Sequence, residues 1–412
     1  MQLMLFGGGR RRSKSGEKLR PSGDDRGRNA TSNQTSTPST TKGGNTSIPD
    51  TPVPAISEVT GNHAGNISGA DQPSHPKEKC QKPPSLPHNE AVIRPRKEPI
   101  SLLKVRTELL GSLSDRVQKS VAIANEQLPT ILTKRRTMTE EAQTIDGLLT
   151  DLQLSLDARE SYKYLPGGHW IPTSCQARWK VAIIVPFRDR FQHLPIFLRH
   201  IVPLLQRQQL EFSIFVTEQN NNLRFNRAML MNVGFVEALN FTAYDCVIFH
   251  DVDHIALNAN NYLGCDGMPR HFISGEAMWG YKILYESLFG GVTGLTTKQM
   301  RDINGLPNVY WGWGGEDDEF AQRVKSHKFQ RTRPTGEIGY FDTINHRSES
   351  GTKANVARFC LLKHQYERAT SDGLSNLAYQ PPIITLNPLY TNISVNVPRL
   401  PWNNHWTRCP GS

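Results

Sequence analysis

The pattern of apolar and polar positions divides this chain of 412 residues into three parts. Before Tyr162 the only aromatic residue is Phe6, and residues 7 to about 100 are rich in Ser, Thr, Pro, Gly and Asn. Such a composition buries too little apolar surface to offset the entropy lost on folding. We therefore predict a disordered stem for residues 1–100, a helical stem or linker for residues 101–145, and a folded α/β domain for residues 146–412.

The second part carries a helical pattern. Its apolar residues recur at roughly helical spacing, which predicts an amphipathic helix. These residues are Leu103, Leu110, Leu113, Val117 and Val121. We expect the apolar face to pack on a neighbouring part of the chain. Self-association through this helix is the alternative.

Two continuous apolar runs, at residues 181–185 and 247–249, predict buried parallel strands. The second run continues into His250, Asp251, Val252 and Asp253. In open α/β sheets, ligands bind beyond the carboxyl ends of the strands. Carboxylates at that edge suit Mn²⁺ or Mg²⁺, which in turn binds a diphosphate.

Residues 310–320 read Tyr-Trp-Gly-Trp-Gly-Gly-Glu-Asp-Asp-Glu-Phe. The glycines allow the backbone to approach a ligand closely, and the tryptophans offer flat faces. The four acids precede apolar residues at helical spacing, so they are placed in a first helical turn, where the helix dipole favours them. Simple capping is therefore one interpretation. We favour a sugar site in which a carboxylate takes a hydroxyl proton.

The stretch from about Cys175 to Pro388 resembles the catalytic domain of the β-1,4-galactosyltransferase family. The matching segments are residues 181–190, 225–228, 232–235, 251–253, 289–292, 311–318 and 371–374. The resemblance implies a GT-A fold, a Rossmann-like α/β sandwich, for residues 146–412. It also implies inverting β-1,4 transfer from a UDP-sugar to terminal GlcNAc of glycoconjugates, with Mn²⁺ as cofactor. A non-catalytic sugar-binding relative is the alternative.

The resemblance assigns roles to individual residues. The implied nucleotide-sugar contacts are Pro186, Phe187, Arg188, Asp189, Arg190, Phe225, Asn226, Arg227, Asp251, Val252, Asp253, Leu288, Gly291, Trp313, His346, Arg347, Ser348 and Glu349. The implied acceptor contacts are Tyr285, Gly315, Glu316, Asp317, Asp318, Arg358, Phe359 and Leu362. Phe187 and Phe225 are the expected uridine wall, with an ordinary core position as the alternative for each ring.

Within this set, Asp317 matches the catalytic base, and Asp253 and His346 match the metal ligands. Thr343 stands where family members carry a methionine ligand. A hydroxyl is a harder and weaker ligand than a thioether, so the third protein ligand is left open.

Leu288 bears on the donor, because galactose-transferring members carry a tyrosine at this position. Leucine removes both the hydroxyl and the bulk of tyrosine, leaving apolar space for an acetamido methyl. Filling that space is worth ~1 kcal/mol, which changes a preference several-fold. We therefore predict UDP-GalNAc as the preferred donor, with UDP-galactose weaker. The alternative is a galactosyltransferase that tolerates the substitution.

The remaining features concern the cellular setting. The resemblance implies the disulfides Cys246–Cys265 and Cys80–Cys175, which fit a secretory lumen. It leaves Cys360 and Cys409 unassigned. Family members are typically type II Golgi proteins, yet the only apolar run near the start is residues 3–6, far short of the roughly 20 residues of a membrane span. We expect the anchor to lie outside this sequence. The net charge of +10 is scattered, so no nucleic-acid partner is predicted.

Overall fold

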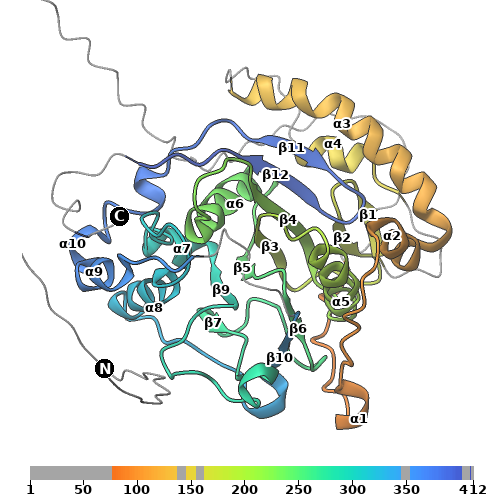
Figure 1. Cartoon of the computed structure of the whole chain (residues 1–412). Helices are drawn as coiled ribbons and strands as arrows, with labels where there is room; N and C mark the ends of the chain where they lie inside the picture. The colour runs from red at the N-terminus through yellow and green to blue at the C-terminus, as the bar shows by residue number, and fades with distance from the viewer. Residues whose placement is uncertain (1–76, 137–144, 155–161, 345–352, 401–408, 410–412) are drawn as a thin grey trace, which may run out of the picture. The chain divides into compact units, whose positions relative to one another are not determined.

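The computed structural model describes residues 77–136, 145–154, 162–344, 353–400 and 409 (Figure 1). The helices are α1 (His88–Ala91), α2 (Leu102–Leu110), α3 (Ser114–Arg136), α4 (Ile145–Asp151), α5 (His193–Arg207), α6 (Arg227–Phe241), α7 (Thr297–Asp302), α8 (Glu316–Ser326), α9 (Arg358–Lys363) and α10 (Gln365–Arg368). The strands are β1 (Tyr162–Leu165), β2 (His169–Pro172), β3 (Lys180–Phe187), β4 (Glu211–Gln219), β5 (Cys246–His250), β6 (His254–Ala256), β7 (Arg270–His271), β8 (Gly275–Glu276), β9 (Val292–Thr296), β10 (Tyr340–Thr343), β11 (Ile383–Leu386) and β12 (Thr391–Val395).

The main sheet has the order β1-β2-β4-β3-β5-β9-β7, and β12 joins β4 and carries β11. Strand β3 runs parallel to both β4 and β5, whereas β9 pairs antiparallel with β5. The strands predicted at residues 181–185 and 247–249 are confirmed as β3 and β5. The carboxyl ends of β3 and β5 therefore open on the same edge of the sheet, where a ligand is expected.

Side chains that alternate along these strands form the core on both faces of the sheet. Ile184, Val247 and Phe249 pack with residues of α6, α7 and α8. Ile183 and Ile248 belong to the larger cluster, which also contains apolar residues of α5. Because both faces are covered, the strands of this central part are continuously apolar, as in other parallel sheets.

A second, three-stranded sheet has the order β6-β10-β8 and continues directly from the Asp-Val-Asp segment. Thr343 of β10 pairs with His254 of β6, and the Ile344 amide donates to the Asp253 carbonyl at 2.8 Å. This pairing brings the end of β10 to the carboxyl end of β5, although the two segments lie about ninety residues apart in the sequence.

The predicted helical part begins with α2 and continues, after a break at Gly111, into α3. Leu110, Val117 and Val121 are buried in the main core, whereas Leu103 is exposed. Asn125 of α3 exchanges two hydrogen bonds, of 2.8 and 2.9 Å, with the main chain of Leu386 in β11. The expectation that the helix packs its apolar face on a neighbouring part of the chain is confirmed.

Residues 77–100 differ from the prediction, which placed them in a disordered stem. Cys80 forms a disulfide with Cys175, and the Ile93 amide donates to the Leu257 carbonyl at 2.8 Å. The Lys97 ammonium contacts the Asp342 carboxylate at 2.5 Å. A segment too poor in apolar residues to fold alone is thus held by a covalent link and by the backbone of the domain. Residues 1–76 lie outside the described part of the chain.

Among the described residues, no helix combines the length and the apolar character needed to cross a membrane.

Candidate active site

The carboxyl end of β5 carries a cluster of three potential metal ligands. Asp251, Asp253 and His254 each place one ligand atom within 4.8 Å of the others. Two carboxylates and an imidazole at one point are a donor set that suits a divalent cation such as Mn²⁺. His254 is absent from the sequence-based ligand set, although it directly follows the Asp-Val-Asp motif.

His254 acts as a counter-charge to the carboxylates of this cluster. Its Nδ1 lies 2.9 Å from Asp253 Oδ1, and its Nε2 lies 3.8 Å from a carboxylate oxygen of Glu276. Burial lowers the pKa of His254, but these carboxylates outweigh burial and raise it to about 10. A cation and a proton therefore compete for this imidazole.

The other predicted metal ligands can be placed only in part. The Thr343 hydroxyl faces the sulfur of Met278 at 3.6 Å, so a thioether lies close to the position where the family carries methionine. His346, together with Arg347, Ser348 and Glu349, lies outside the described residues.

Arg227 links this cluster to the acidic turn of α8. Its Nε donates to Asp251 Oδ1 at 2.8 Å, and its Nη1 lies 3.6 Å from Glu316 Oε1. Burial alone lowers the pKa of Arg227, yet Asp251 and Glu316 raise it above its usual value. A fixed positive charge thus joins two motifs that are 65 residues apart, a separation given by their numbers 251 and 316.

The predicted first turn of α8 is confirmed, because the helix begins at Glu316 after Gly315 in a left-handed conformation with φ 101°. Burial, followed by the neighbouring Asp317, raises the pKa of Glu316 to about 7. Burial, followed by Asp318, also raises the pKa of Asp317. Carboxylates that resist ionisation in this way are typical of functional sites.

The Phe-Gly-Gly segment runs between the acidic turn and the metal-ligand cluster. A Cβ atom on Gly290 would lie 2.7 Å from Asp317 Oδ2, and one on Gly291 would lie 2.9 Å from His254 Nε2. Gly291 also has φ +70°. Only glycine therefore allows the backbone to pass between the predicted base and the cation site.

The aromatic loop before α8 is held at several points, while Trp313 stays 64% exposed. The Gly312 amide donates to the Phe225 carbonyl at 2.8 Å, and the Trp313 amide donates to the Lys353 carbonyl at 3.1 Å. The Arg358 guanidinium lies 5.8 Å from the Trp313 ring. The loop is thus fixed by its backbone and presents a free indole face.

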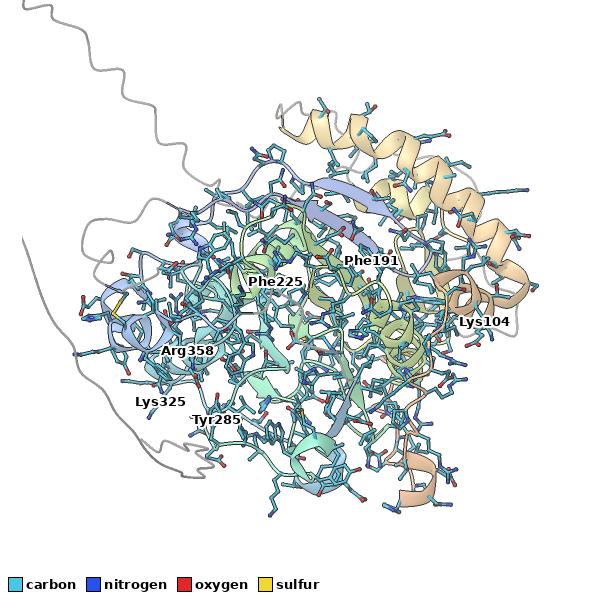
Figure 2. All side chains as sticks on the ribbon, in the orientation of Figure 1. Lys104, Phe191, Phe225, Tyr285, Lys325 and Arg358 are labelled. Atoms are coloured by element: carbon cyan, nitrogen blue, oxygen red, sulfur yellow. A yellow bond between two sulfur atoms is a disulfide. The ribbon has the colours of Figure 1, made fainter. Side chains whose placement is uncertain are left out.

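Two of the predicted acceptor residues, Tyr285 and Arg358, lie on the same side of the domain (Figure 2). The Tyr285 hydroxyl donates to Asp318 Oδ1 at 2.9 Å, which joins the segment before Phe-Gly-Gly to the acidic turn. Phe359 is 70% exposed, with the Arg358 guanidinium 4.6 Å from its ring. Leu362 packs partly buried against a small cluster that includes Tyr310.

The predicted nucleotide-binding side chains differ in how deeply they are buried. Phe225 is partly buried, with the Arg188 guanidinium 5.2 Å from its ring, and Arg190 has a buried Nη1 with no hydrogen-bond partner. Phe187 is only 1% exposed and packs in the main core, which favours the core alternative given for this ring. Asn226 is fully buried, and its side chain accepts the Met229 amide at the start of α6. In the described structure this side chain therefore acts as the N-terminal cap of the helix.

The predicted disulfides Cys246–Cys265 and Cys80–Cys175 are confirmed. Cys360 and Cys409, which had no assigned role, form a third disulfide. All six cysteines are therefore paired, and the third disulfide ties α9 to Cys409.

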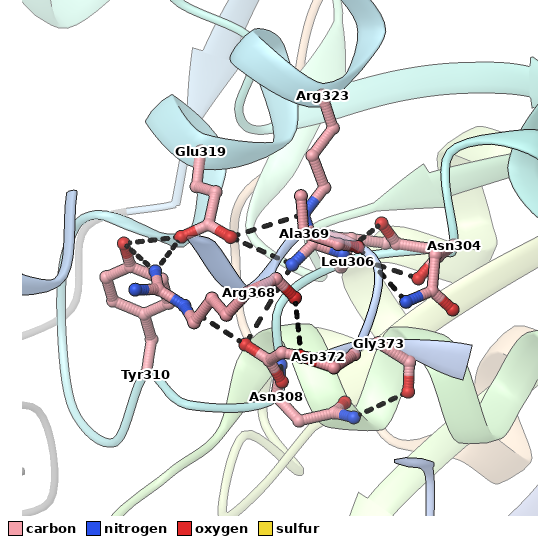
Figure 3. A network of polar contacts seen from close by, with 12 residues as sticks. Asn304, Leu306, Asn308, Tyr310, Glu319, Arg323, Arg368, Ala369, Asp372 and Gly373 are labelled. Carbon is pink, nitrogen blue, oxygen red and sulfur yellow. Dashed lines mark hydrogen bonds and ion pairs between the residues drawn. The ribbon is translucent and has the colours of Figure 1, made fainter. Parts of the chain in front are cut away.

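A buried polar network behind α8 escaped the sequence-based interpretation (Figure 3). Glu319 accepts the Tyr310 hydroxyl at 2.8 Å and Arg323 Nη2 at 2.8 Å. Arg368 also contacts Glu319, and its Nε lies 3.3 Å from Asp372 Oδ2. Because Tyr310 precedes the aromatic loop and Glu319 follows it, the network holds both ends of the loop.

We expect Arg368→Met to destabilise the domain by roughly 3–5 kcal/mol, because the buried carboxylates of Glu319 and Asp372 would be left to share the single guanidinium of Arg323. Burial already raises the pKa of Asp372 to about 6. Chemical denaturation measures the change, with Lys298→Met as control, since the Lys298–Asp302 pair is exposed. The control should shift the free energy of unfolding by less than ~1 kcal/mol. Equal effects of the two variants would contradict this role of the network.

A cluster of metal ligands at the carboxyl end of a parallel strand, next to an acidic helix start, is typical of glycosyltransferases with the GT-A fold. These enzymes use nucleotide-sugar donors. A family model for the N-terminal region of glycosyl transferase group 7 matches residues 140–266. A model for the N-terminal domain of galactosyltransferase matches residues 270–347.

Comparison with individual proteins gives the same class. Over 232 residues the chain is 52% identical to β-1,4-galactosyltransferase 6 of Rattus norvegicus, covering 56% of this chain and 60% of that protein. It is 44% identical to β-1,4-galactosyltransferase 4 of Cricetulus griseus, covering 56% of this chain and 67% of that protein. The chain belongs to the β-1,4-galactosyltransferase family, and it spans about three fifths of the length of the first curated relatives it matches.

Among solved structures, a Drosophila β-1,4-galactosyltransferase 7 mutant in complex with manganese, UDP-Gal and xylobiose is similar to this chain. It shows 31% sequence identity and a TM-score of 0.45, and the match covers 53% of this chain and 94% of that one.

Proposed function

We propose that this protein is an inverting, metal-dependent β-1,4-galactosyltransferase that uses UDP-galactose and a sugar acceptor. One observation carries the proposal. The carboxylate of Asp317, which has a raised pKa, lies against Gly290 and is joined through Glu316 and Arg227 to Asp251 of the metal-ligand cluster. The proposed base and the proposed cation site are thus neighbours, with the backbone of Gly290 and Gly291 between them.

The residues divide the reaction between them. Asp317 takes the proton of the acceptor hydroxyl while that oxygen forms a bond to the anomeric carbon of the donor and the bond from this carbon to the diphosphate oxygen breaks. Glu316 Oε2 is buried without a hydrogen-bond partner, so it is available to a sugar hydroxyl. Trp313 covers the donor and limits hydrolysis by water.

The cation would be held by Asp253 with Asp251 and His254, and it would offset the negative charge of the departing diphosphate. On the protein side, Arg188 and Arg190 supply guanidinium groups that suit phosphate or uridine oxygens. Phe225 supplies a flat face below Arg188.

UDP-galactose is the proposed donor because the relatives described above are all named galactosyltransferases. This supports the alternative interpretation of Leu288, in which a galactosyltransferase tolerates leucine, over a preference for UDP-GalNAc. Leu288 is half-buried and directly precedes Phe289. The missing tyrosine still leaves apolar space, so we propose UDP-GalNAc as a slower second donor.

We expect Leu288→Tyr to lower kcat/KM for UDP-GalNAc relative to UDP-galactose by about three- to tenfold, because the ring occupies the space that an acetamido methyl would use. Steady-state kinetics with both donors and one acceptor measure the ratio. Leu284→Tyr is the matched control, since Leu284 is exposed in the same segment. An unchanged ratio in Leu288→Tyr would remove this residue from donor selection.

The exposed residues of the acceptor side and the disulfides bear on the acceptor and on the cellular route. Exposed Phe359 and the polar edge of Tyr285 suit a sugar ring, with terminal GlcNAc as the acceptor implied by the family. Three disulfides fit a secretory compartment, with the Golgi lumen as the proposed location.

The test of the proposed function is the purified protein with Mn²⁺, assayed with a panel of UDP-sugars against acceptors ending in GlcNAc, glucose or xylose. Transfer of galactose in β-1,4 linkage is expected. The panel also separates acceptors of the N-glycan, glycolipid and proteoglycan-linker types. Donor binding without transfer to any acceptor would instead favour a non-catalytic sugar-binding relative.

A further inference from the structure

A turn at residues 285–288 joins the two sides of the proposed site. At its start, the Tyr285 hydroxyl donates to Asp318 on the proposed acceptor side. At its end stands Leu288, the residue proposed above to neighbour the donor sugar. The Leu288 amide donates to the Tyr285 carbonyl at 3.1 Å. This single bond leaves the carbonyls of Glu286, Ser287 and Leu288 to find partners elsewhere.

Two arginines supply those partners. Arg331 Nη1 donates to the carbonyls of Ser287 at 2.8 Å and Leu288 at 3.3 Å, and its Nη2 donates to the Glu286 carbonyl at 2.9 Å. Arg333 Nη2 donates to the carbonyls of Glu286 and Leu288, both at 3.1 Å. A guanidinium presents its donors in a rigid plane, so two of them constrain three successive peptide groups.

The constraint continues to the Phe-Gly-Gly segment through a buried histidine. Arg333 Nε lies 3.1 Å from His271 Nδ1, and His271 Nε2 lies 3.0 Å from the Gly290 carbonyl. Because the arginine can only donate, His271 accepts at Nδ1 and donates from Nε2. Gly290 is the residue that lies against Asp317.

The environment keeps His271 neutral, as this chain of hydrogen bonds requires. Burial, and next the charge of Arg333, lowers the pKa of His271 to about 3. The Arg331 guanidinium also lies 5.4 Å from the Phe289 ring, so the clamp contacts every residue from Glu286 to Gly290. We call Arg331, Arg333 and His271 the carbonyl clamp.

We propose that the carbonyl clamp positions residues 285–290 and that Arg331 thereby helps to determine how the donor sugar is bound and selected. The inference rests on the proposed function, because it takes Leu288 as a neighbour of the donor sugar. None of the three residues belongs to the motifs that carry the family resemblance. Arg331 is a positioning residue that acts through the backbone of Leu288 and through the Phe289 ring.

The test compares Arg331→Met with Arg331→Lys and with Arg301→Met. Arg301 lies on α7, with its guanidinium 6.0 Å from the Phe235 ring, so it matches Arg331 in its aromatic contact but has no part in the clamp. We expect Arg331→Met to raise KM for UDP-galactose by about tenfold, with a smaller change in kcat. Three hydrogen bonds are lost, but Arg333 still donates to two of the three carbonyls. Arg331→Lys should raise KM for UDP-galactose by less than Arg331→Met does, since an ammonium group can still donate to one carbonyl.

Donor selection gives a readout that a purely structural role would not move. In Arg331→Met, the ratio of kcat/KM for UDP-galactose to that for UDP-GalNAc should move toward one, because Leu288 is no longer held in place. Arg301→Met should leave the ratio unchanged. A lowered Tm with the same donor ratio and the same KM as the wild type would overturn the proposal.

Binding separates this inference from the proposed function. Titration calorimetry with Mn²⁺ compares UDP-galactose with UDP, which lacks the sugar. The clamp predicts that Arg331→Met weakens UDP-galactose and leaves UDP unchanged, even if no acceptor is ever glycosylated. Binding without transfer would reject the proposed enzyme activity alone. Equal binding of UDP-galactose by the wild type and Arg331→Met would reject the clamp alone.

Discussion

Asp317→Asn should lower galactose transfer by roughly 10² or more while leaving UDP binding intact, because an amide cannot accept the proton of the acceptor hydroxyl. The substitution is nearly isosteric, and the Asp318 amide, which donates to Asp317 Oδ1 at 3.1 Å, can donate to an amide oxygen as well. Single-turnover kinetics at saturating donor and acceptor measure the chemical step. Calorimetry with UDP reports the integrity of the nucleotide site.

The neighbouring acids offer the competing assignments for the base. Asp318 is occupied by Tyr285, and Glu316 faces Arg227, which leaves Asp317 as the acid in the turn that lies against Gly290. Near-normal turnover in Asp317→Asn would move the role to Glu316 or Asp318. Asp302→Asn, at an exposed pair on α7, serves as the control and should keep full activity.

Asp253→Asn should abolish transfer, because it removes a charged ligand from the cation site. Chelation should have the same effect on the wild type, and added Mn²⁺ should restore activity in the wild type only. The fold should survive, since the contact of this residue to β10 is made by its carbonyl, which accepts the Ile344 amide. Circular dichroism and the Tm of the variant check this point.

Two further results would change the metal assignment. Full transfer by the wild type in EDTA would show that no cation is required. Mn²⁺-dependent binding of UDP that persists in Asp253→Asn would show that Asp251 and His254, with residues outside the described part, suffice to hold the ion. Both measurements use the same preparation. Asp302→Asn is the control for the loss of one negative charge away from the site.

Local patterns were sufficient for the central elements. The apolar runs of β3 and β5 identify buried strands, since a covered parallel sheet leaves no polar face. The glycines and acids between Tyr310 and Phe320 identify a loop followed by a helix start, because glycine and the helix dipole act over a few residues. The family resemblance added two disulfides, and the structure confirms both.

Local patterns failed where a residue depends on what packs over it. Phe187 continues an apolar strand, and only the packing of the domain shows that its ring is covered. Residues 77–100 lack the apolar surface that would predict folding, yet the Cys80–Cys175 disulfide and backbone hydrogen bonds attach them to the domain. Composition predicts how a segment behaves by itself, whereas residues 77–100 are ordered by their contacts with the folded domain.

The sequence by itself thus determined the class of fold, the strand that ends in Asp-Val-Asp and the acidic start of α8. Only the tertiary structure decided that Arg227 joins these motifs, that His254 completes the ligand cluster and that Arg331 grips the turn before Phe-Gly-Gly. The physical reason is the range of the interactions. Periodicity, capping and turn preferences act between residues close in sequence, but ion pairs and hydrogen bonds form wherever the folded backbone brings partners within about 3 Å.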